Sequence, residues 1–236
     1  MSDVTASVGP LPQVKAALFD IDGTLTSGGQ PWIELVSSPQ VTKPHKAWLY
    51  LTGMPHYGLS KIGIADPAAF RDRWVRLMAG LMSGWRAEDV QAMCTRIVER
   101  SLVPVLRPDM VERVRAHKAQ GHTVVLVSTM FETIGEALAQ NVGADRGLGS
   151  IVAMRENGTC AGKISGQTCS GPRKLDFAQA YLAATLPGVT LDQCAAYADS
   201  ASDIPFLSGV GYPTAVYPDD RMRAAAEECG WPIIEA

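Results

Sequence analysis

Two aspartates with one residue between them follow the apolar run at residues 14–19. The stretch reads AALFDIDGT over residues 16–24, so Asp20 and Asp22 come where a short buried strand should end. Side chains two positions apart on an extended chain point to the same side, so both carboxylates would face one space. Converging carboxylates repel each other, and a shared proton or a hard divalent cation such as Mg²⁺ relieves that repulsion. Taken alone, the two residues are equally well interpreted as an acidic turn.

Further polar groups follow later apolar runs. Ser128 comes after one such run and is predicted to open a helix over residues 129–141, where its hydroxyl would bind an anion or cap the helix. Asp199 ends the run AAYAD, Asp203 follows four residues later, and Lys174 lies between these groups in the chain. Ligands of open parallel sheets bind at the carboxyl ends of the strands. The order of acid pair, hydroxyl, lysine and second acid pair therefore favours one site over several unrelated surface residues.

Short apolar runs alternate with helical patterns along most of the chain. Strands are predicted at 14–19, 122–127, 151–165 (a hairpin around Asn157-Gly158), 211–217 and 231–234, with a further strand that ends AAYAD at Asp199, and helices at 108–120, 129–141, 173–184 and 218–229. This alternation predicts an α/β fold with a parallel sheet covered on both faces.

One long segment breaks the alternation. Between residues 28 and 105 no buried parallel strand is predicted, whereas residues 74–82 and 87–100 have helical patterns. We expect residues 1–13 to be a flexible N-terminal tail, residues 14–27 and 106–236 to form the core, and residues 28–105 to form a mainly helical cap. Four of the five tryptophans, Trp32, Trp48, Trp74 and Trp85, belong to this cap segment.

The composition excludes several classes of protein. With 47% hydrophobic residues, 19% charged residues and a net charge of −3, the chain lacks the basic surplus of a nucleic-acid binder. Five cysteines without a C-x-x-C pair indicate reduced thiols in a cytoplasmic protein. The N-terminus does not have the pattern of a signal peptide, and no apolar segment is long enough for a membrane span.

The polar groups together resemble a known family. Asp20-Ile21-Asp22-Gly23-Thr24-Leu25, Ser128 after a hydrophobic strand, Lys174 and the stretch Asp199 to Asp203 resemble the four motifs of the haloacid dehalogenase (HAD) superfamily. The insert after the first motif resembles the cap of its subfamily IB, which includes the phosphoserine phosphatases. The resemblance covers nearly the whole chain after the first dozen residues. It implies a HAD-like Rossmannoid core, a doubly wound parallel sheet with a mainly helical cap inserted after the first strand.

The resemblance also implies an activity and a role for each motif residue. The protein would be a Mg²⁺-dependent phosphatase that hydrolyses a small-molecule phosphomonoester through an aspartyl phosphate, and the presence of Asp22 favours this chemistry over dehalogenation. Asp20 would be the nucleophile and Asp22 the general acid and base. Mg²⁺ would be held by Asp20, the backbone carbonyl of Asp22, and Asp199. Ser128, Thr129 and Lys174 would bind the phosphoryl group, with Asp203 and Ser200 in support.

The substrate is less well defined by the sequence. Phosphoserine phosphatases usually have serine where Gly23 stands and an acid within about the next dozen positions, whereas this chain has no acid before Glu34. As a candidate substrate, phosphoserine is therefore ranked below an unspecified small phosphomonoester. Trp32 would line a substrate pocket or pack in the cap core. Arg73 and Arg76 share a helical face that would reach an anionic substrate or face solvent.

Two other functions remain open at this stage. A receiver-like switch would also gather acids, a hydroxyl and a lysine around a phosphorylated aspartate, but it needs neither Asp22 nor a large cap. A phosphotransferase would use the same aspartyl phosphate. Whether the protein is a phosphatase or a phosphotransferase, the expected partner is a phosphorylated small molecule. The sequence is compatible with a monomer or a homodimer.

Overall fold

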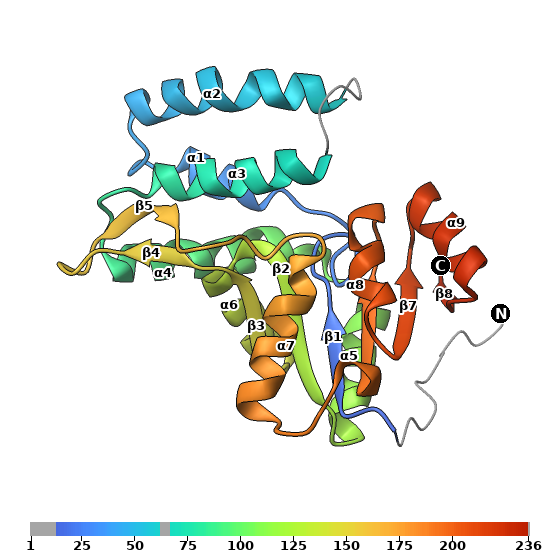
Figure 1. Cartoon of the computed structure of the whole chain (residues 1–236). Helices are drawn as coiled ribbons and strands as arrows, with labels where there is room; N and C mark the ends of the chain where they lie inside the picture. Colours follow the sequence, from blue (N-terminus) through green and yellow to red (C-terminus); the bar gives the residue numbers. More distant parts are fainter. Residues whose placement is uncertain (1–12, 62–66, 236) are drawn as a thin grey trace.

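The centre of the molecule is a six-stranded parallel sheet (Figure 1). The computed structural model describes residues 13–61 and 67–235. The strand order is β3-β2-β1-β6-β7-β8. The bounds are Ala16–Phe19 for β1, Thr123–Phe131 for β2, Arg146–Ser150 for β3, Cys194–Ala198 for β6, Tyr212–Val216 for β7 and Ile233–Ile234 for β8. Because β1 lies in the middle and pairs with both β2 and β6, the residues that follow these strands meet at one edge of the sheet.

Alternate residues of the central strands serve two separate cores. Phe19 and Leu126 belong to the core under α5 (Pro108–Ala119) and α6 (Glu132–Val142). Leu18 belongs to the opposite core under α7 (Arg173–Thr185), α8 (Ile204–Ser208) and α9 (Asp220–Cys229). A strand that is buried on both faces has to be apolar at every position, which explains the uninterrupted runs in the sequence. The prediction of a doubly wound α/β fold is confirmed.

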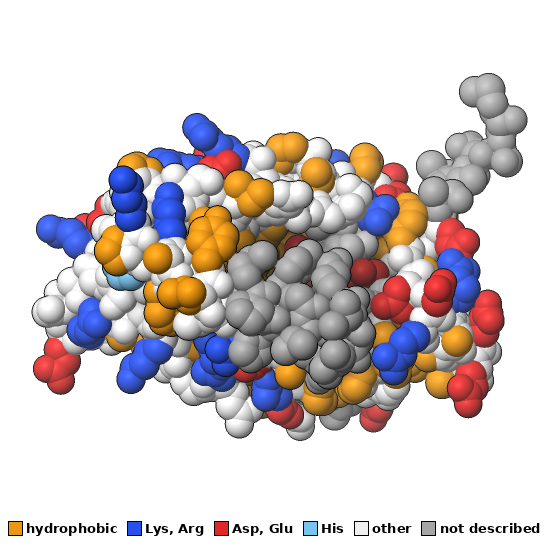
Figure 2. Space-filling model, turned by 90° about the horizontal axis from the view of Figure 1, so that it is seen from above, with side chains coloured by type: hydrophobic (Ala, Val, Ile, Leu, Met, Phe, Trp, Pro, Cys, Tyr) orange, Lys and Arg blue, Asp and Glu red, His pale blue; other side chains and the backbone are white. Residues whose placement is uncertain are grey.

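The segment between β1 and α5 is helical. It contains α1 (Pro31–Ser37), α2 (Lys43–Lys61), α3 (Pro67–Leu81), α4 (Ala87–Ile97), a π-helical turn η1 (Val98–Leu102) and a 3₁₀ turn η2 (Val103–Val105). Figure 1 shows α2 and α3 stacked above one end of the sheet. On the face formed by these helices, exposed hydrophobic side chains lie among lysines and arginines (Figure 2). The exposed hydrophobic residues of this segment include Ile33, Trp48, Tyr50 and Leu51.

The antiparallel hairpin β4 (Val152–Met154) and β5 (Cys160–Ile164) joins this helical layer. The Gly84 N–H donates to the Cys160 carbonyl at 2.9 Å, and the Cys160 N–H donates to the Trp85 carbonyl at 2.7 Å. The hairpin predicted around Asn157-Gly158 is thus present, with Gly158 at φ +77° in its turn. The proposed division into tail, core and cap remains a prediction, and its tail falls almost entirely outside the described residues.

Three predictions about the elements are wrong: β3 (Arg146–Ser150) was not predicted as a strand, the helix predicted at 74–82 begins at Pro67, and the boundary between β2 and α6 is misplaced. Strand β2 continues to Phe131 and α6 begins only at Glu132, so the helix does not start at residue 129 and Ser128 does not open it. The residues TMF that follow Ser128 are β-branched, flexible or aromatic, and they fit an extended strand as well as a first helical turn. The end of α6 is as predicted, because Gly143 adopts φ +82° and closes the helix.

All five cysteines are unpaired, and four of them are buried, namely Cys94, Cys160, Cys169 and Cys194. Over the part of the chain that the structure describes, no helix combines the length and the hydrophobicity needed to cross a bilayer.

Candidate active site

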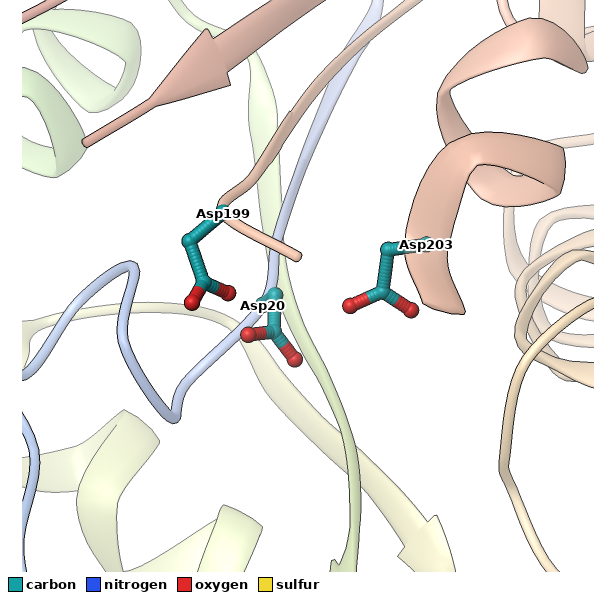
Figure 3. Close-up of side chains that lie close together, drawn as sticks. All are labelled: Asp20, Asp199 and Asp203. Atoms are coloured by element: carbon teal, nitrogen blue, oxygen red, sulfur yellow. The ribbon is translucent and has the colours of Figure 1, made fainter. Parts of the chain in front are cut away.

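Three aspartates converge at the carboxyl edge of the sheet (Figure 3). Asp20 directly follows β1, Asp199 directly follows β6, and Asp203 ends the 3₁₀ turn η4 (Ala201–Asp203). One carboxylate oxygen from each lies within 4.8 Å of the others. The Asp20 N–H donates to the Tyr197 carbonyl at 2.9 Å, so the β1–β6 pairing extends to the site and fixes the first aspartate beside the second.

Lys174 supplies a positive charge at this cluster. It lies in the first turn of α7, is 2% exposed, and its Nζ donates to Asp20 Oδ1 at 2.5 Å and to Asp203 Oδ2 at 2.9 Å. Burial alone would lower the pKa of Lys174, but the adjacent carboxylates of Asp20 and Asp203 raise it well above its ordinary value. The side chain is therefore an ammonium that ties α7 to β1.

One ammonium does not balance three carboxylates. Burial raises the pKa of Asp20 well above its ordinary value, with the charges of Asp203 and Asp199 acting in the same direction and Lys174 opposing them. Burial and Asp203 also raise the pKa of Asp199 to about 6, although Lys174 and the Thr24 hydroxyl, 3.2 Å from Asp199 Oδ1, oppose the shift. Three hard oxygen donors with excess negative charge form a donor set that suits Mg²⁺.

The carboxyl group of Asp22 lies outside this trio and lines a cavity of about 820 Å³. Although Asp22 has solvent-accessible surface there, the protein atoms around the cavity desolvate it and raise its pKa. Lys174 and Arg71 oppose this shift, so Arg71 of α3 lies close enough to act on the charge of Asp22. Arg71 was considered together with Arg73 and Arg76 from the sequence, but only Arg73 and Arg76 were proposed to contact the substrate, because these two share a helical face.

The predicted phosphate-binding residues of β2 lie in the strand itself. Ser128 is 2% exposed, and its Oγ accepts from the Met130 N–H at 3.2 Å. The Thr129 carbonyl accepts from Ser150 Oγ at 2.8 Å, which anchors the end of β2 to β3. Their role in binding a phosphoryl group remains a prediction.

Two further residues support the aspartates in ways that were not predicted from the sequence. Asp219, the N-cap of α9, accepts from the Ala201 N–H at 2.9 Å and from the Met222 N–H at 2.8 Å, so it ties the loop after Asp199 to α9. Ser200, predicted to support the site, is paired with the Ser202 hydroxyl at 2.9 Å. Asp219 has a sequence signal, because an aspartate before a helical pattern is a common N-cap.

The second residue is Gly23, which the sequence places in the first motif but whose close approach to Asp199 was not predicted. Its φ is +86°, and a Cβ at this position would overlap the Asp199 carboxylate. Glycine at position 23 therefore allows the loop after β1 to pass directly over the second acid.

The cap residues proposed for substrate selection separate into two groups. Trp32 lines the same cavity as Asp22. Arg73 donates to the Thr52 carbonyl at 3.3 Å, and Arg76 pairs with Asp72 at 3.1 Å. Neither arginine is among the described residues that line this cavity.

Comparison with known proteins gives a family match. A model of the family described as haloacid dehalogenase-like hydrolase matches residues 17–208. The chain is 29% identical over 164 residues to the inhibition of morphological differentiation protein of Streptomyces azureus, covering 70% of this chain and 58% of that protein. It therefore spans little more than half the length of that relative.

Two other relatives are covered more completely. Phosphoserine phosphatase SerB1 of Mycobacterium tuberculosis is 27% identical over 234 residues, covering 95% of this chain and 71% of that protein. Histidinol-phosphatase of Neisseria meningitidis is 23% identical over 238 residues, covering 92% of this chain and 97% of that protein.

Solved structures share the fold. A Bordetella pertussis Tohama I protein of unknown function superimposes with a TM-score of 0.78 at 22% identity, covering 94% of this chain and 98% of that one. A substrate-bound phosphoserine phosphatase gives a TM-score of 0.63 at 18% identity, covering 94% of this chain and 93% of that one. At these identities the match concerns the fold alone.

Proposed function

This chain belongs to the haloacid dehalogenase-like hydrolase family, and from that premise we propose that it is a Mg²⁺-dependent phosphatase acting on a small phosphomonoester. The observation that carries the proposal is the cluster of the buried Asp20, Asp203 and Lys174 with the half-buried Asp199 at the carboxyl edge of the sheet, with Asp22 beside it on a cavity. Relatives named phosphoserine phosphatase and histidinol-phosphatase support a small-molecule substrate.

In the first step, Asp20 is the nucleophile. A carboxylate oxygen of Asp20 forms a bond to phosphorus while the bond between phosphorus and the ester oxygen breaks, which gives an aspartyl phosphate. Asp22 donates its proton to the departing alkoxide oxygen, so the alcohol leaves uncharged. Lys174 holds Asp20 in place and offsets part of the negative charge that gathers at the site.

The second step regenerates the enzyme. Asp22, now a carboxylate, takes a proton from a water molecule whose oxygen attacks phosphorus. The bond between phosphorus and Asp20 breaks, and inorganic phosphate is released. Asp20, Asp199 and the Asp22 carbonyl would hold Mg²⁺, with Asp203 in support, and the bound ion supplies positive charge opposite the phosphoryl oxygens. Ser128 and Thr129 are proposed to bind those oxygens.

The test is the variant Asp20→Asn, assayed with p-nitrophenyl phosphate in the presence of MgCl₂. Removing the nucleophile should lower kcat by roughly 10⁴-fold or more, as removal of a nucleophile does in other covalent enzymes. Asp176→Asn is the matched control, because Asp176 is an exposed aspartate on the same helix as Lys174. Full activity of Asp20→Asn would refute the nucleophile, and full activity of the wild type in EDTA would refute the metal requirement.

The same preparations separate the two alternatives. A receiver-like switch would retain phosphate on Asp20 after exposure to acetyl phosphate, whereas a phosphatase would release it rapidly. A phosphotransferase would pass the phosphoryl group to an added alcohol in preference to water.

The five unpaired cysteines support a reducing compartment, and we propose the cytoplasm.

A further inference from the structure

The cavity beside Asp22 has two chemically different ends. It lies between the loop after β1 and the helices α1 and α3. Asp22 and Asp199 form one end, where the phosphoryl group would lie. Trp32, Phe70 and Trp74 are the aromatic lining residues, and they come from the two helices. At about 820 Å³, the cavity is within the size range of pockets that bury a small organic ligand.

The aromatic rings form a fixed wall. The Phe70 and Trp74 rings lie 5.6 Å apart and are tilted by 31°. Trp32 packs edge-on against Phe131, with ring centroids 5.1 Å apart, and Phe131 is only 1% exposed. Since Trp32 is braced by a core residue at the end of β2, its ring is held relative to the sheet and not only to the cap.

The two tryptophans are not simply cap core. A second cavity of about 260 Å³ lies against Trp32 and Trp74 on the side of Leu49 and Tyr50. Both indole rings therefore border open space on the substrate side and on the side of α2. An aromatic residue whose only role is packing would be surrounded by protein atoms, so this position favours contact with a ligand.

No charged side chain is among the described residues that line the aromatic end, although Arg71 of α3 lies close enough to act on the charge of Asp22 at the other end. Among the described residues that line the larger cavity, the charged ones are Asp22 and Asp199, both at the phosphoryl end, and Gln30 is a neutral polar group. Phosphoserine would bring an ammonium and a carboxylate into this space, and burying unpaired charges is costly. An uncharged ring has no such cost and gains apolar contact with the wall.

We propose that the cavity selects a phosphomonoester whose alcohol carries an uncharged aromatic ring, bound against Trp32, Phe70 and Trp74. This inference rests on the proposed phosphatase function, since that function places the ester oxygen beside Asp22. It assigns the wall formed by α1 and α3 as the part of the protein that distinguishes substrates.

The first experiment compares kcat/KM for four esters of primary alcohols: 2-phenylethyl, 2-cyclohexylethyl and ethyl phosphate, and O-phosphoserine. Because all four leaving groups are primary alkoxides, differences report mainly binding of the alcohol portion. One buried methylene changes kcat/KM about 10- to 200-fold, so the phenyl ester should exceed ethyl phosphate by about 100-fold or more. It should exceed the cyclohexyl ester by about 3- to 10-fold, because ring–ring contacts add to area burial. Equal values for the phenyl and ethyl esters, or a preference for O-phosphoserine, would overturn the proposal.

Substitutions in the aromatic wall test whether it causes the preference for the phenyl ester. Trp74→Leu and Phe70→Leu keep an apolar side chain but remove a ring, so the ratio of kcat/KM for the phenyl ester to that for ethyl phosphate should fall about tenfold in each. Trp48→Leu is the matched control. Trp48 packs beside Gly80, is 42% exposed and does not line the cavity, so its substitution should leave the ratio unchanged. A fall in the ratio for Trp48→Leu equal to that for Trp74→Leu would refute the assignment of the wall.

A binding measurement separates this inference from the proposed function. 2-Phenylethanol, the product alcohol, should quench tryptophan fluorescence in the wild type and lose most of that effect in Trp74→Leu, after correction for the removed fluorophore by comparison with Trp48→Leu. If the alcohol binds in this way but no ester is hydrolysed, the aromatic site stands and the phosphatase proposal fails. If all four esters are hydrolysed at equal rates and the alcohol does not bind, the phosphatase stands and the aromatic site fails.

Discussion

The buried histidine pair behind the sheet predicts how the stability of this protein depends on pH. His117, in the last turn of α5, is fully buried. Its Nδ1 lies 2.8 Å from His122 Nδ1, and its Nε2 lies 2.8 Å from the Tyr197 hydroxyl. Two Nδ1 atoms in contact can share only one proton, so protonating both rings on this side would break the contact. Burial, His122 and Arg113 lower the pKa of His117 to about 4.

The sign and size of the effect follow from this shift. In the unfolded chain the histidine has its ordinary pKa of 6.5, so below pH 6.5 the unfolded state binds a proton that the folded state does not. The free energy of unfolding therefore falls as pH falls, by at most about 1.4 kcal/mol per pH unit. Between pH 6.5 and 4.5 the loss from this group is about 2 kcal/mol, and above pH 7.5 the contribution is constant.

The assay is urea unfolding followed by circular dichroism at pH 7.5, 6.5, 5.5 and 4.5, for the wild type and for His117→Gln. Glutamine keeps a polar group beside Tyr197 but does not titrate. The difference between the two proteins cancels the carboxylates, which titrate in both. The stability advantage of the wild type over the variant should shrink by about 2 kcal/mol from pH 6.5 to 4.5. A difference that stays constant over this range, or that grows as pH falls, would refute the reasoning.

Two substitutions test the contacts around the acid cluster. Gly23→Ala should lower kcat more than about tenfold, because the new Cβ would displace the Asp199 carboxylate. Gly158→Ala has a similar positive φ in open space, so it should reproduce the backbone strain of about 1–2 kcal/mol without the loss of activity. Asp72→Asn breaks the 2.8 Å ion pair between α3 and Arg173, and because both side chains are partly exposed it should lower the free energy of unfolding by about 1 kcal/mol or less in thermal denaturation. A loss above about 3 kcal/mol would mean that this contact holds the insert on the core.

The central strands β1, β2 and β6 were predictable from the sequence because they are buried on both faces, whereas the edge strand β3 was not predicted. Short uninterrupted apolar runs, such as those at β1, β2 and β6, are typical of strands in a parallel sheet that is covered on both faces. The start of α6 was not predictable, since Thr129 and Met130 suit a strand end and a helix start equally, and only pairing of Phe131 with Ser150 in β3 decides the matter. Local preference sets element type, and tertiary pairing sets the boundary.

The candidate active site also has parts that local sequence predicts and parts that only tertiary packing determines. The sequence pattern predicts that Asp20 and Asp199 each follow a strand of a parallel sheet, and the structure shows that these two strands are adjacent. The contacts of Asp219 and the position of Arg71 depend on how α9 and α3 pack, and no local pattern contains that information. The same holds for Arg73 and Arg76, whose helical spacing placed them together but whose partners lie within the helical segment.

The two ends of the cavity meet different physical demands. At the sheet edge, three carboxylates and one ammonium leave two excess negative charges in a buried place, which opposes folding and raises the pKa of Asp20 and Asp199. Under the proposed function, a phosphoryl group that arrives with a cation would use this excess negative charge. Among the described lining residues the aromatic end carries no charge, so under the proposal Trp32 and Trp74 could change with the substrate without disturbing the acids. Selectivity is therefore expected to vary within this family through α1 and α3, while the carboxyl ends of β1 and β6 remain fixed by the chemistry.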